Sequence, residues 1–543
     1  MAGETVNLGS IGFVWKGDYN LLTPYKLQHV VKYSGNTYIA KVANTGQTPP
    51  TNGVDTVYWA YITNISGETM LTANYAKAAG NVSSPLLDLI LNSAGTARAS
   101  YARDFKYTGD SSTTYIDRYG VLQKAPYYTG TATSGAVNSL TNSGAVWVSD
   151  ELKDYILHIT AGTGAGQYRW VIGNNATTLT VSKPFTVALD ATSVYKIKKP
   201  RFQKDGFLCE PEATNYFLDS NTVMGVNEGV TVTPDTAIDP TGVTSLMDAI
   251  LEDNTTGIHR NYVPYSIATA GSMVTYSRFV KAAGRTKGQL VLFTDGATIG
   301  IATFDLNEGT VVASGVGAKA AITALANGIF RVQITGITLT QTLVSCHVSL
   351  LSDTGLNVYA GTPGLGMYVY GGQLEQTPFA TSLIYATTVP VTRTATYAEV
   401  AFAENFATIN AEEVSIAVDY NRIGEGSTIL LQPICSVNGA INILLRASAL
   451  YNPNLLEFFY GSSAATGSGQ SLHTLHRVLG IFTKTTKKLF LDGVFKTEVA
   501  AQTVTGTPTG ILIGAWSSTY LGGHVKRVRI WDRALNTQEA GIA

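Results

Sequence analysis

Apolar and polar residues alternate along most of this chain with the period of two that is typical of half-buried β-strands. The alternation is clearest in five stretches, at residues 272–281, 289–293, 301–306, 328–334 and 414–420. The pair Asp492-Gly493 lies between two apolar runs, and this dipeptide favours a tight β-hairpin. We therefore predict an all-β fold.

Changes in this pattern divide the chain into several domains. We predict a small β module at residues 1–65, a short helical connector at 66–100, a β-sandwich at 101–125 plus 199–398, an inserted small β domain at 126–198 and a second β-sandwich at 399–543. The connector is expected to be helical because an apolar run follows Pro85, and proline suits the first turn of a helix. The insertion has its own strand pattern, and surface loops tolerate insertions well.

The composition suits short strands joined by turns, and it argues against several classes of function. Charged residues make up 14% of the chain, below the usual ~25%, while the chain contains 54 glycines and 29 tyrosines. The net charge of −1 provides no basic field, so we expect no nucleic-acid partner. No apolar stretch reaches the roughly 18 residues that cross a membrane, so we expect no membrane insertion.

The cysteines and the N-terminus give two further expectations. Cys209, Cys346 and Cys435 are far apart and odd in number, which favours free, buried thiols over disulfides, metal sites or redox pairs. The first residues, Met1 to Glu4, show neither the basic nor the apolar region of a signal peptide, so we expect none.

The first segment has a pattern of its own. Aromatic and apolar residues alternate with polar ones over residues 13–40, and an aromatic run closes the module at 58–62. This pattern resembles the small chitin-binding-type β modules of chitinases, which recur in phage tail proteins. Those modules often carry paired exposed aromatics just after the equivalent strand, and none follow here. We therefore expect a docking or spacer role, with the aromatic side chains of Trp15, Tyr19, Tyr33 and Trp59 in the core.

Two separated stretches, residues 112–122 and 200–215, resemble two sequence motifs that lie close together in the sequences of many phage structural proteins. The first contains Tyr115-Ile116-Asp117, and the second begins Pro200-Arg201-Phe202. Here the inserted domain separates the two motifs.

Two later stretches resemble known sandwich domains. Gly372-Gln373-Leu374-Glu375, followed by residues 380–384, resembles the closing phrase of carbohydrate-binding-module-like jelly-roll domains in phage tail and head-fibre proteins. Residues 525–539 resemble the end of the concanavalin A-like, laminin-G-type lectin fold. These resemblances imply a jelly roll for the first sandwich and a lectin-like second sandwich, and they mark fold more than ligand.

Glycoside hydrolysis requires two carboxylates that face one groove. Asp205 with Glu210, and Glu412 with Glu413, are the pairs that the sequence offers. Adjacent glutamates on a strand point to opposite faces, which argues against the pair Glu412 and Glu413. Asp205 and Glu210 belong to the motif shared with phage structural proteins, and we interpret both as residues that stabilise a turn. No parallel β-helix repeat runs along the chain. We therefore predict no catalytic residues.

Other reactive residue types form no convincing site. His473 and His476 are three residues apart, but no helix is predicted there to place them on one face and no third metal ligand accompanies them. We therefore expect both to be solvated surface histidines. Laminin-G-like domains hold calcium at a pair of loop carboxylates, for which Asp492 and Asp532 are available, although each also suits a turn. We predict no cofactor and no metal.

Sugar binding has better support, because aromatic faces with neighbouring amides and hydroxyls recognise saccharides. In the second sandwich we predict ligand contacts from loop residues at its edge, where such sites lie. The candidates are Tyr451, Asn452, Tyr460, Trp516 and Tyr520, and the alternative for them is packing between subunits.

Together, these features predict a non-enzymatic bacteriophage tail fibre or similar adhesin that contacts host surface polysaccharide. We expect a homotrimer whose N-terminal region binds other virion proteins. It would be made in the host cytoplasm and carried on the released particle. Two alternatives remain: a structural head-fibre, decoration or baseplate-peripheral protein, and a capsular polysaccharide depolymerase.

Overall fold

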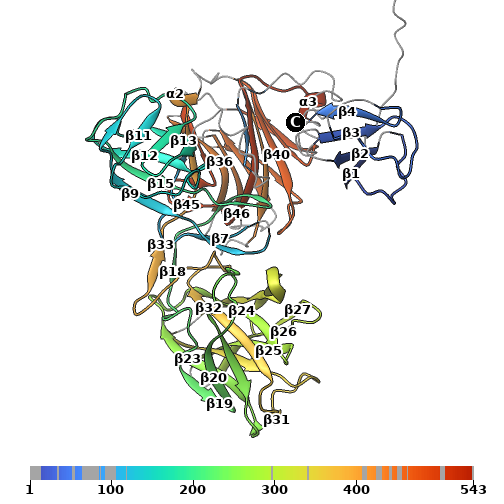
Figure 1. Cartoon of the computed structure of the whole chain (residues 1–543), viewed down its shortest axis with the longest axis vertical. Coiled ribbons are helices and arrows are strands. Elements are labelled where there is room, and N and C mark those ends of the chain that lie inside the picture. Colours follow the sequence, from blue (N-terminus) through green and yellow to red (C-terminus); the bar gives the residue numbers. More distant parts are fainter. Residues whose placement is uncertain are drawn as a thin grey trace, which may run out of the picture. The chain divides into compact units, whose positions relative to one another are not determined.

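The computed structural model describes residues 14–27, 29–33, 36–51, 56–63, 85, 87–91, 105–117, 119–294, 297–338, 341–405, 413–423, 431–439, 443–448, 455–460, 463–501 and 508–540. These residues form sheets almost throughout, which confirms the predicted all-β, multidomain fold (Figure 1). The chain separates into two compact units, Met1–Ser84 with Leu535–Ala543, and Pro85–Ala534. In the described part of the chain, no helix is long and apolar enough to cross a membrane.

The first unit contains one four-stranded sheet. Its order is β1 (Val14–Asp18), β2 (His29–Tyr33), β3 (Asn36–Ala40) and β4 (Trp59–Thr63), with β1 and β2 parallel. Tyr25, Tyr38 and Trp59 are buried together, and Tyr19 and Tyr33 pack against them. The aromatic residues therefore form the core of this module, as the sequence predicts. The short helix α3 (Thr537–Ala540) also belongs to this unit.

The expected helical connector at 66–100 is wrong where the structure describes it. Leu87–Ile90 forms strand β5, which pairs antiparallel with β46 (Gly523–Trp531). Leu87 and Leu89 are fully buried, and Asp88 between them forms an ion pair with Arg527 at 2.6 Å. The apolar run therefore has the period of a strand, and the neighbouring edge of β46 provides the hydrogen bonds that a helix would have satisfied internally.

Residues 126–198 contain a separate seven-stranded sheet. In sheet order its strands are β10 (Ser134–Gly135), β11 (Ser139–Thr141), β14 (Thr178–Val181), β13 (Tyr168–Asn174), β12 (Ile156–Ala161), β15 (Val194–Lys198) and β9 (Tyr127–Thr131). Leu157, Ile159 and Ile197 are fully buried in its core. Tyr168 and Trp170 belong instead to the core of the C-terminal sandwich, against which this sheet packs.

A sandwich of two six-stranded sheets follows. One sheet has the order β19 (Val226–Glu228), β23 (His259–Ser266), β30 (Leu343–Leu350), β25 (Lys287–Thr294), β26 (Ala297–Asp305) and β27 (Thr310–Ser314). The other has the order β20 (Val230–Ala237), β21 (Met247–Glu252), β32 (Gly366–Glu375), β24 (Met273–Ala283), β29 (Phe330–Thr338) and β28 (Lys319–Ala324). Inward-facing residues of both sheets, such as Leu290 and Val280, share one core.

The C-terminal sandwich also has two sheets. The larger has the order β16 (Phe202–Gln203), β17 (Gly206–Cys209), β46, β35 (Val414–Arg422), β40 (His476–Phe482), β41 (Thr486–Leu491) and β42 (Val494–Ala500), with β5 beside β46. The other has the order β39 (Ser463–Ser468), β38 (Leu455–Tyr460), β37 (Ile443–Ser448), β36 (Leu431–Gly439), β43 (Pro508–Ile513), β34 (Ala398–Ala401) and β6 (Lys106–Tyr107). The helix α2 (Phe402–Asn405) follows β34.

Three of these strands lie in a different domain from the one that the sequence assigns them. Residues 106–107, 202–203 and 206–209 were expected in the first sandwich, but they extend the two sheets of the C-terminal sandwich. Phe207 and Cys209 are fully buried in that core, which explains the placement. Pairing across such a sequence distance leaves no local signal.

Two smaller expectations are confirmed. Asp492 and Gly493 both have positive φ, 53° and 77°, as a tight β41–β42 hairpin turn requires. Cys209, Cys346 and Cys435 are free and buried.

Candidate functional site

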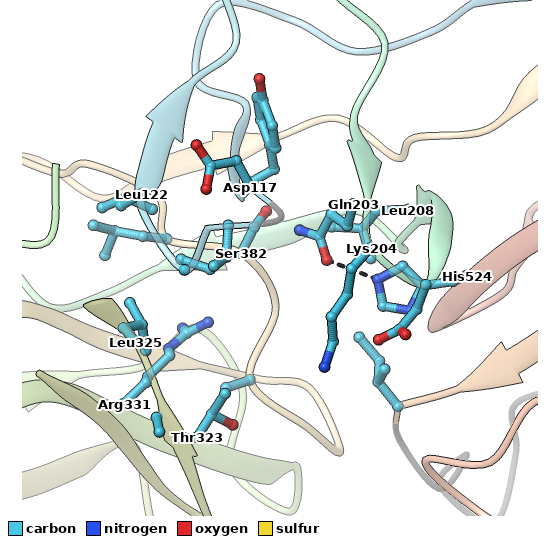
Figure 2. Close-up of a pocket in the computed structure, with 18 of the residues that line it drawn as sticks. Asp117, Leu122, Gln203, Lys204, Leu208, Thr323, Leu325, Arg331, Ser382 and His524 are labelled. Atoms are coloured by element: carbon cyan, nitrogen blue, oxygen red, sulfur yellow. Dashed lines mark hydrogen bonds between the residues drawn. The ribbon is translucent and has the colours of Figure 1, made fainter. Parts of the chain in front are cut away.

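A pocket of about 650 Å³ opens within the second unit, at the meeting of the two sandwiches (Figure 2). Its walls come from the hairpin of β7 (Thr114–Ile116) and β8 (Leu122–Lys124), the β16–β17 turn, strands β28 and β29, and the adjoining ends of β35 and β46. The volume lies within the range of about 300–1,000 Å³ that small-molecule sites occupy.

The β16–β17 turn brings Lys204 and Asp205 to this pocket. Gly206 follows them with φ 127°, and a Cβ there would lie 2.6 Å from the Val525 carbonyl oxygen of β46. Only glycine allows this close approach, so the turn is fixed against β46. Lys204 is exposed, and Figure 2 shows its ammonium group extending into the pocket.

His524 stands at the start of β46, opposite Leu208 of β17. It is only 5% exposed, and its Nε2 lies 2.7 Å from the Gln203 Oε1. Because this amide oxygen is a hydrogen-bond acceptor, the ring hydrogen is on Nε2, which donates the bond, and Nδ1 keeps its lone pair. Nδ1 is buried and has no hydrogen-bond partner among the described residues. Burial lowers the pKa of His524 to about 4, so the ring is neutral near pH 7 and offers an acceptor.

Arg331 of β29 occupies another wall of the pocket. Its Nη2 donates to the Ser277 hydroxyl at 3.0 Å, and its guanidinium lies 5.4 Å from the centre of the Phe279 ring. Its Nε is buried without a partner, and no ion pair involves Arg331 in the described part of the chain. Burial lowers the pKa of Arg331, and the carboxylates of Glu375 and Glu210, which lie beyond ion-pair distance, only partly offset this effect.

Asn421, at the end of β35, adds a second open acceptor. Its side chain is 7% exposed, and its Oδ1 is buried without a partner among the described residues. The pocket therefore combines cationic donors with two buried acceptors, His524 Nδ1 and Asn421 Oδ1.

Glu210 also lines the pocket, but it belongs to a buried ion cluster with Arg201 and Arg393. It forms an ion pair with Arg201, lies 3.5 Å from Arg393 Nη2, and accepts from the backbone N–H and the hydroxyl of Ser382, both at 2.7 Å. Burial alone would raise the pKa of Glu210, but the two arginine charges and these hydrogen bonds outweigh it and hold the pKa at about 2.

The turn role expected for Glu210 is therefore wrong, whereas Asp205 does lie in a turn. Both oxygens of Glu210 are already engaged, and the group stays ionised, so it cannot donate a proton to a glycosidic oxygen. Glu412 lies outside the described residues, and Glu413 directly precedes β35.

Asp117 is likewise engaged. Its Oδ1 accepts from the backbone N–H groups of Tyr119 and Val121, at 2.8 and 3.0 Å, and its Oδ2 accepts from Gln123 at 3.0 Å. These bonds shape the β7–β8 turn, which presents Tyr119 at the pocket with 69% of its surface exposed.

The predicted sugar-contacting residues lie elsewhere. Trp516 and Tyr520 belong to a small hairpin of β44 (Ala515–Trp516) and β45 (Thr519–Tyr520) and do not line the pocket. The register pairs Trp516 with Thr519 and Ala515 with Tyr520, so the two aromatic residues face opposite sides of the hairpin. Tyr520 stacks on Tyr397, with ring centres 5.8 Å apart.

The remaining candidates are placed only in part. Tyr460 is the last residue of β38, where its backbone pairs with Ser463. Tyr451 and Asn452 lie outside the described residues. Of the five predicted residues, the structure therefore describes the side chains of Trp516 and Tyr520 alone, and it does not bring these two together.

His476 is not the solvated residue that the sequence predicts, whereas His473 is exposed. His476 is 6% exposed, its Nδ1 lies 2.8 Å from Asp492, and its Nε2 lies 3.1 Å from the Ser471 hydroxyl. This order of groups resembles a hydrolytic triad. However, the backbone N–H of Ser471 donates to the same Nε2 at 2.8 Å and occupies its lone pair. We interpret these hydrogen bonds as structural, because they hold the loop before β40 in place.

Asp492 also accepts from the backbone N–H of Arg477 at 2.8 Å, so both of its oxygens are used. Asp532 is exposed just after β46. Across the described ranges, no group of three or more His, Cys, Asp or Glu side chains could hold a metal ion.

No sequence signal singles out Arg331 or His524. Arg331 and Gln333 alternate with apolar residues in β29, and polar residues at such positions normally face solvent. Only the packing of the second sandwich against this polar face makes it a pocket wall.

No protein-family model matches the chain, and no curated protein matches it in sequence. Among solved structures, it is similar to domain 4 of the arabinanase AbnA from Geobacillus stearothermophilus, with 13% identity, 27% of this chain and 71% of that chain covered, and a TM-score of 0.23. A Trypanosoma rangeli sialidase matches with 9% identity, coverage of 55% and 60%, and a TM-score of 0.21. Domains LG4-5 of the mouse laminin alpha1 chain match with 12% identity, coverage of 52% and 90%, and a TM-score of 0.18. At such TM-scores these likenesses carry no argument about function.

Proposed function

We propose that this protein binds glycans without catalysis and that the pocket at the meeting of the sandwiches is its binding site. The observation that carries this proposal is a set of buried polar atoms in residues that line the pocket, namely His524 Nδ1, Asn421 Oδ1 and Arg331 Nε, which have no hydrogen-bond partner among the described residues. Buried polar groups are normally satisfied, and unsatisfied ones in a pocket suit a polar ligand. A saccharide supplies hydroxyls for such groups, and Tyr119 at the pocket offers an aromatic face.

We propose further that the protein is a bacteriophage tail fibre or similar virion adhesin. The support is the resemblance of residues 112–122, 200–215 and 372–384 to phrases of phage structural proteins. In this proposal the N-terminal module binds other virion proteins, the chain forms a homotrimer, and the sandwiches contact polysaccharide on the host surface. Avidity from several copies would compensate for weak binding at each site.

Binding of purified full-length protein to whole bacteria, together with its native mass, tests this proposal. We expect a trimer that coats cells of the host strain and is displaced by their purified surface polysaccharide. A well-folded protein that coats no strain would contradict glycan binding and favour the structural head-fibre or decoration role. A zone of degraded capsule around a spot of the protein would contradict the absence of catalysis.

A further inference from the structure

The charges of the pocket are unequally satisfied. Of the carboxylates that line it, Glu210 is paired with arginines and Asp117 accepts three hydrogen bonds, whereas Asp205 has no ion pair among the described residues and its charge acts on His524, whose pKa it raises against the effect of burial. The cations Lys204 and Arg331 have no ion-pair partner among the described residues. Figure 2 shows them reaching into the pocket from different walls.

A partly buried guanidinium without an ion pair is unfavourable in a folded protein unless an anion or several hydrogen bonds compensate it. Arg331 has one hydrogen bond and one ring contact, and its Nε faces no acceptor in the described structure. Lys204 adds a second positive charge at the exposed side of the same pocket. An anionic ligand group would complete both side chains.

The remaining open groups specify the rest of the ligand. His524 Nδ1 and Asn421 Oδ1 are acceptors, so they need donors from the ligand. Hydroxyl groups provide such donors, and a carboxylate provides the anion. A sugar acid combines both in one molecule.

We infer that the pocket binds an acidic saccharide whose carboxylate is neutralised by Arg331 and Lys204, while its hydroxyls donate to His524 and Asn421. This inference rests on the proposed glycan-binding function and narrows its ligand class. Because Lys204 is exposed to solvent, its attraction to the ligand carboxylate is screened by salt, and added salt should weaken the binding.

Saturation-transfer NMR on the full-length protein tests this inference. The probes are glucuronate, galacturonate and N-acetylneuraminate, each beside its neutral methyl ester, together with the neutral sugars glucose, galactose and N-acetylglucosamine. We expect at least one acid to bind, and its methyl ester to bind at least about tenfold more weakly. A loss of this size corresponds to one charge-assisted hydrogen bond, which the neutral ester cannot form. A sugar phosphate probe shows whether a phosphate can replace the carboxylate.

Variants assign the binding to the pocket. Lys204→Met removes an exposed charge with little risk to folding, and Arg331→Met removes a partly buried one; each should weaken binding of the acid at least about tenfold. Arg278→Met is the control for Arg331→Met, because Arg278 also lies over an aromatic ring, 4.2 Å from the centre of Phe217, but does not line the pocket. Lys153→Met, on an exposed turn, is the control for Lys204→Met.

The outcomes separate this inference from the proposed function. Equal binding of acid and ester, or acid binding that survives both pocket variants, would overturn the inference. Neutral sugars that bind and are lost in the pocket variants would also overturn it but would leave glycan binding intact. If no acid in the panel binds, the inference is overturned, and the binding assay on whole cells then decides the proposed function separately.

Discussion

Two neighbouring regions of the second unit hold arginines in different ways, fully buried in one and partly buried in the other. In the ion cluster, Arg201 and Arg393 surround the carboxylate of Glu210, and all three side chains are at most 1% exposed. In the pocket wall, Arg331 has a hydroxyl and a ring for neighbours and no carboxylate within ion-pair distance among the described residues. The charges of the first arrangement are paired within the protein, although Arg201 Nε and Arg393 Nε have no hydrogen-bond partner among the described residues, whereas the charge of Arg331 has no ion-pair partner there.

The comparison shows that burial of a charge does not by itself indicate function. A closed ion cluster joins residues that are distant in sequence and fixes how the strands meet, whereas an open cation can gain free energy when a ligand arrives. The predictions below change one region and use the other as the reference.

Glu210→Gln should have the largest effect. It leaves Arg201 and Arg393 buried without their carboxylate, and such a change typically lowers the free energy of unfolding by about 3–5 kcal/mol. Denaturant unfolding of the full chain measures it, with Asp205→Asn as the control because Asp205 lines the same pocket without an ion pair. An equal loss in both variants would contradict the structural role of the ion cluster.

The two regions should also lose stability in different pH windows. The pKa of His524 is about 4 in the folded chain, below its ordinary 6.5, so the unfolded chain takes up the proton first. Stability is therefore lost as pH falls from 6.5 to 4, by about 1.4 kcal/mol per pH unit from this residue. Glu210 has a folded pKa of about 2 against 4.5, so its contribution is present above pH 4.5 and is lost as pH falls toward 2.

The variant His524→Gln isolates the first window. Its stability should fall less steeply between pH 6.5 and 4 than that of the unchanged protein, whereas the lower window should keep its slope. Urea unfolding across this pH range provides the measurement. Identical slopes in the two proteins would show that the pKa of His524 is the same in the folded and the unfolded chain, which would contradict its burial as a neutral ring.

Arg331→Met should change stability by less than about 1 kcal/mol, because relief from burying the charge offsets the lost hydrogen bond. Arg201→Met, which breaks the ion cluster, should cost about 3–5 kcal/mol. Thermal unfolding of both variants without ligand compares them directly. Similar losses would mean that Arg331 is a structural residue like Arg201.

Ser471→Ala should have the smallest effect, below about 1 kcal/mol, since the backbone N–H of residue 471 still holds His476. For the same reason, Ser471 should not react with a fluorophosphonate probe. Labelling of the protein that disappears in Ser471→Ala would instead reveal a serine hydrolase.

The alternating pattern was sufficient for the all-β fold and for individual turns, such as Asp492-Gly493, because strand periodicity and turn chemistry are local. It misled at Leu87–Ile90, where a proline and an apolar run suit a helix as well as a strand. The edge of β46, more than four hundred residues later in the chain, decided between them.

The candidate site could not be predicted for a related reason. Trp516 and Tyr520 are suitable residue types, but their hairpin register directs them to opposite faces. Lys204 and His524 come from distant segments of one sheet of the C-terminal sandwich, Arg331 comes from the first sandwich, and each is unremarkable in its own segment.

The sequence by itself therefore determined the strand content, the turns and the free cysteines, all of which follow from residue types and short spacings. Tertiary structure alone decided which strands share a sheet, that Glu210 is enclosed by arginines, and that Arg331 has no ion-pair partner among the described residues. The physical reason is that sheet pairing, burial and charge compensation depend on residues far apart in the chain, and their free energies are set only when those residues meet.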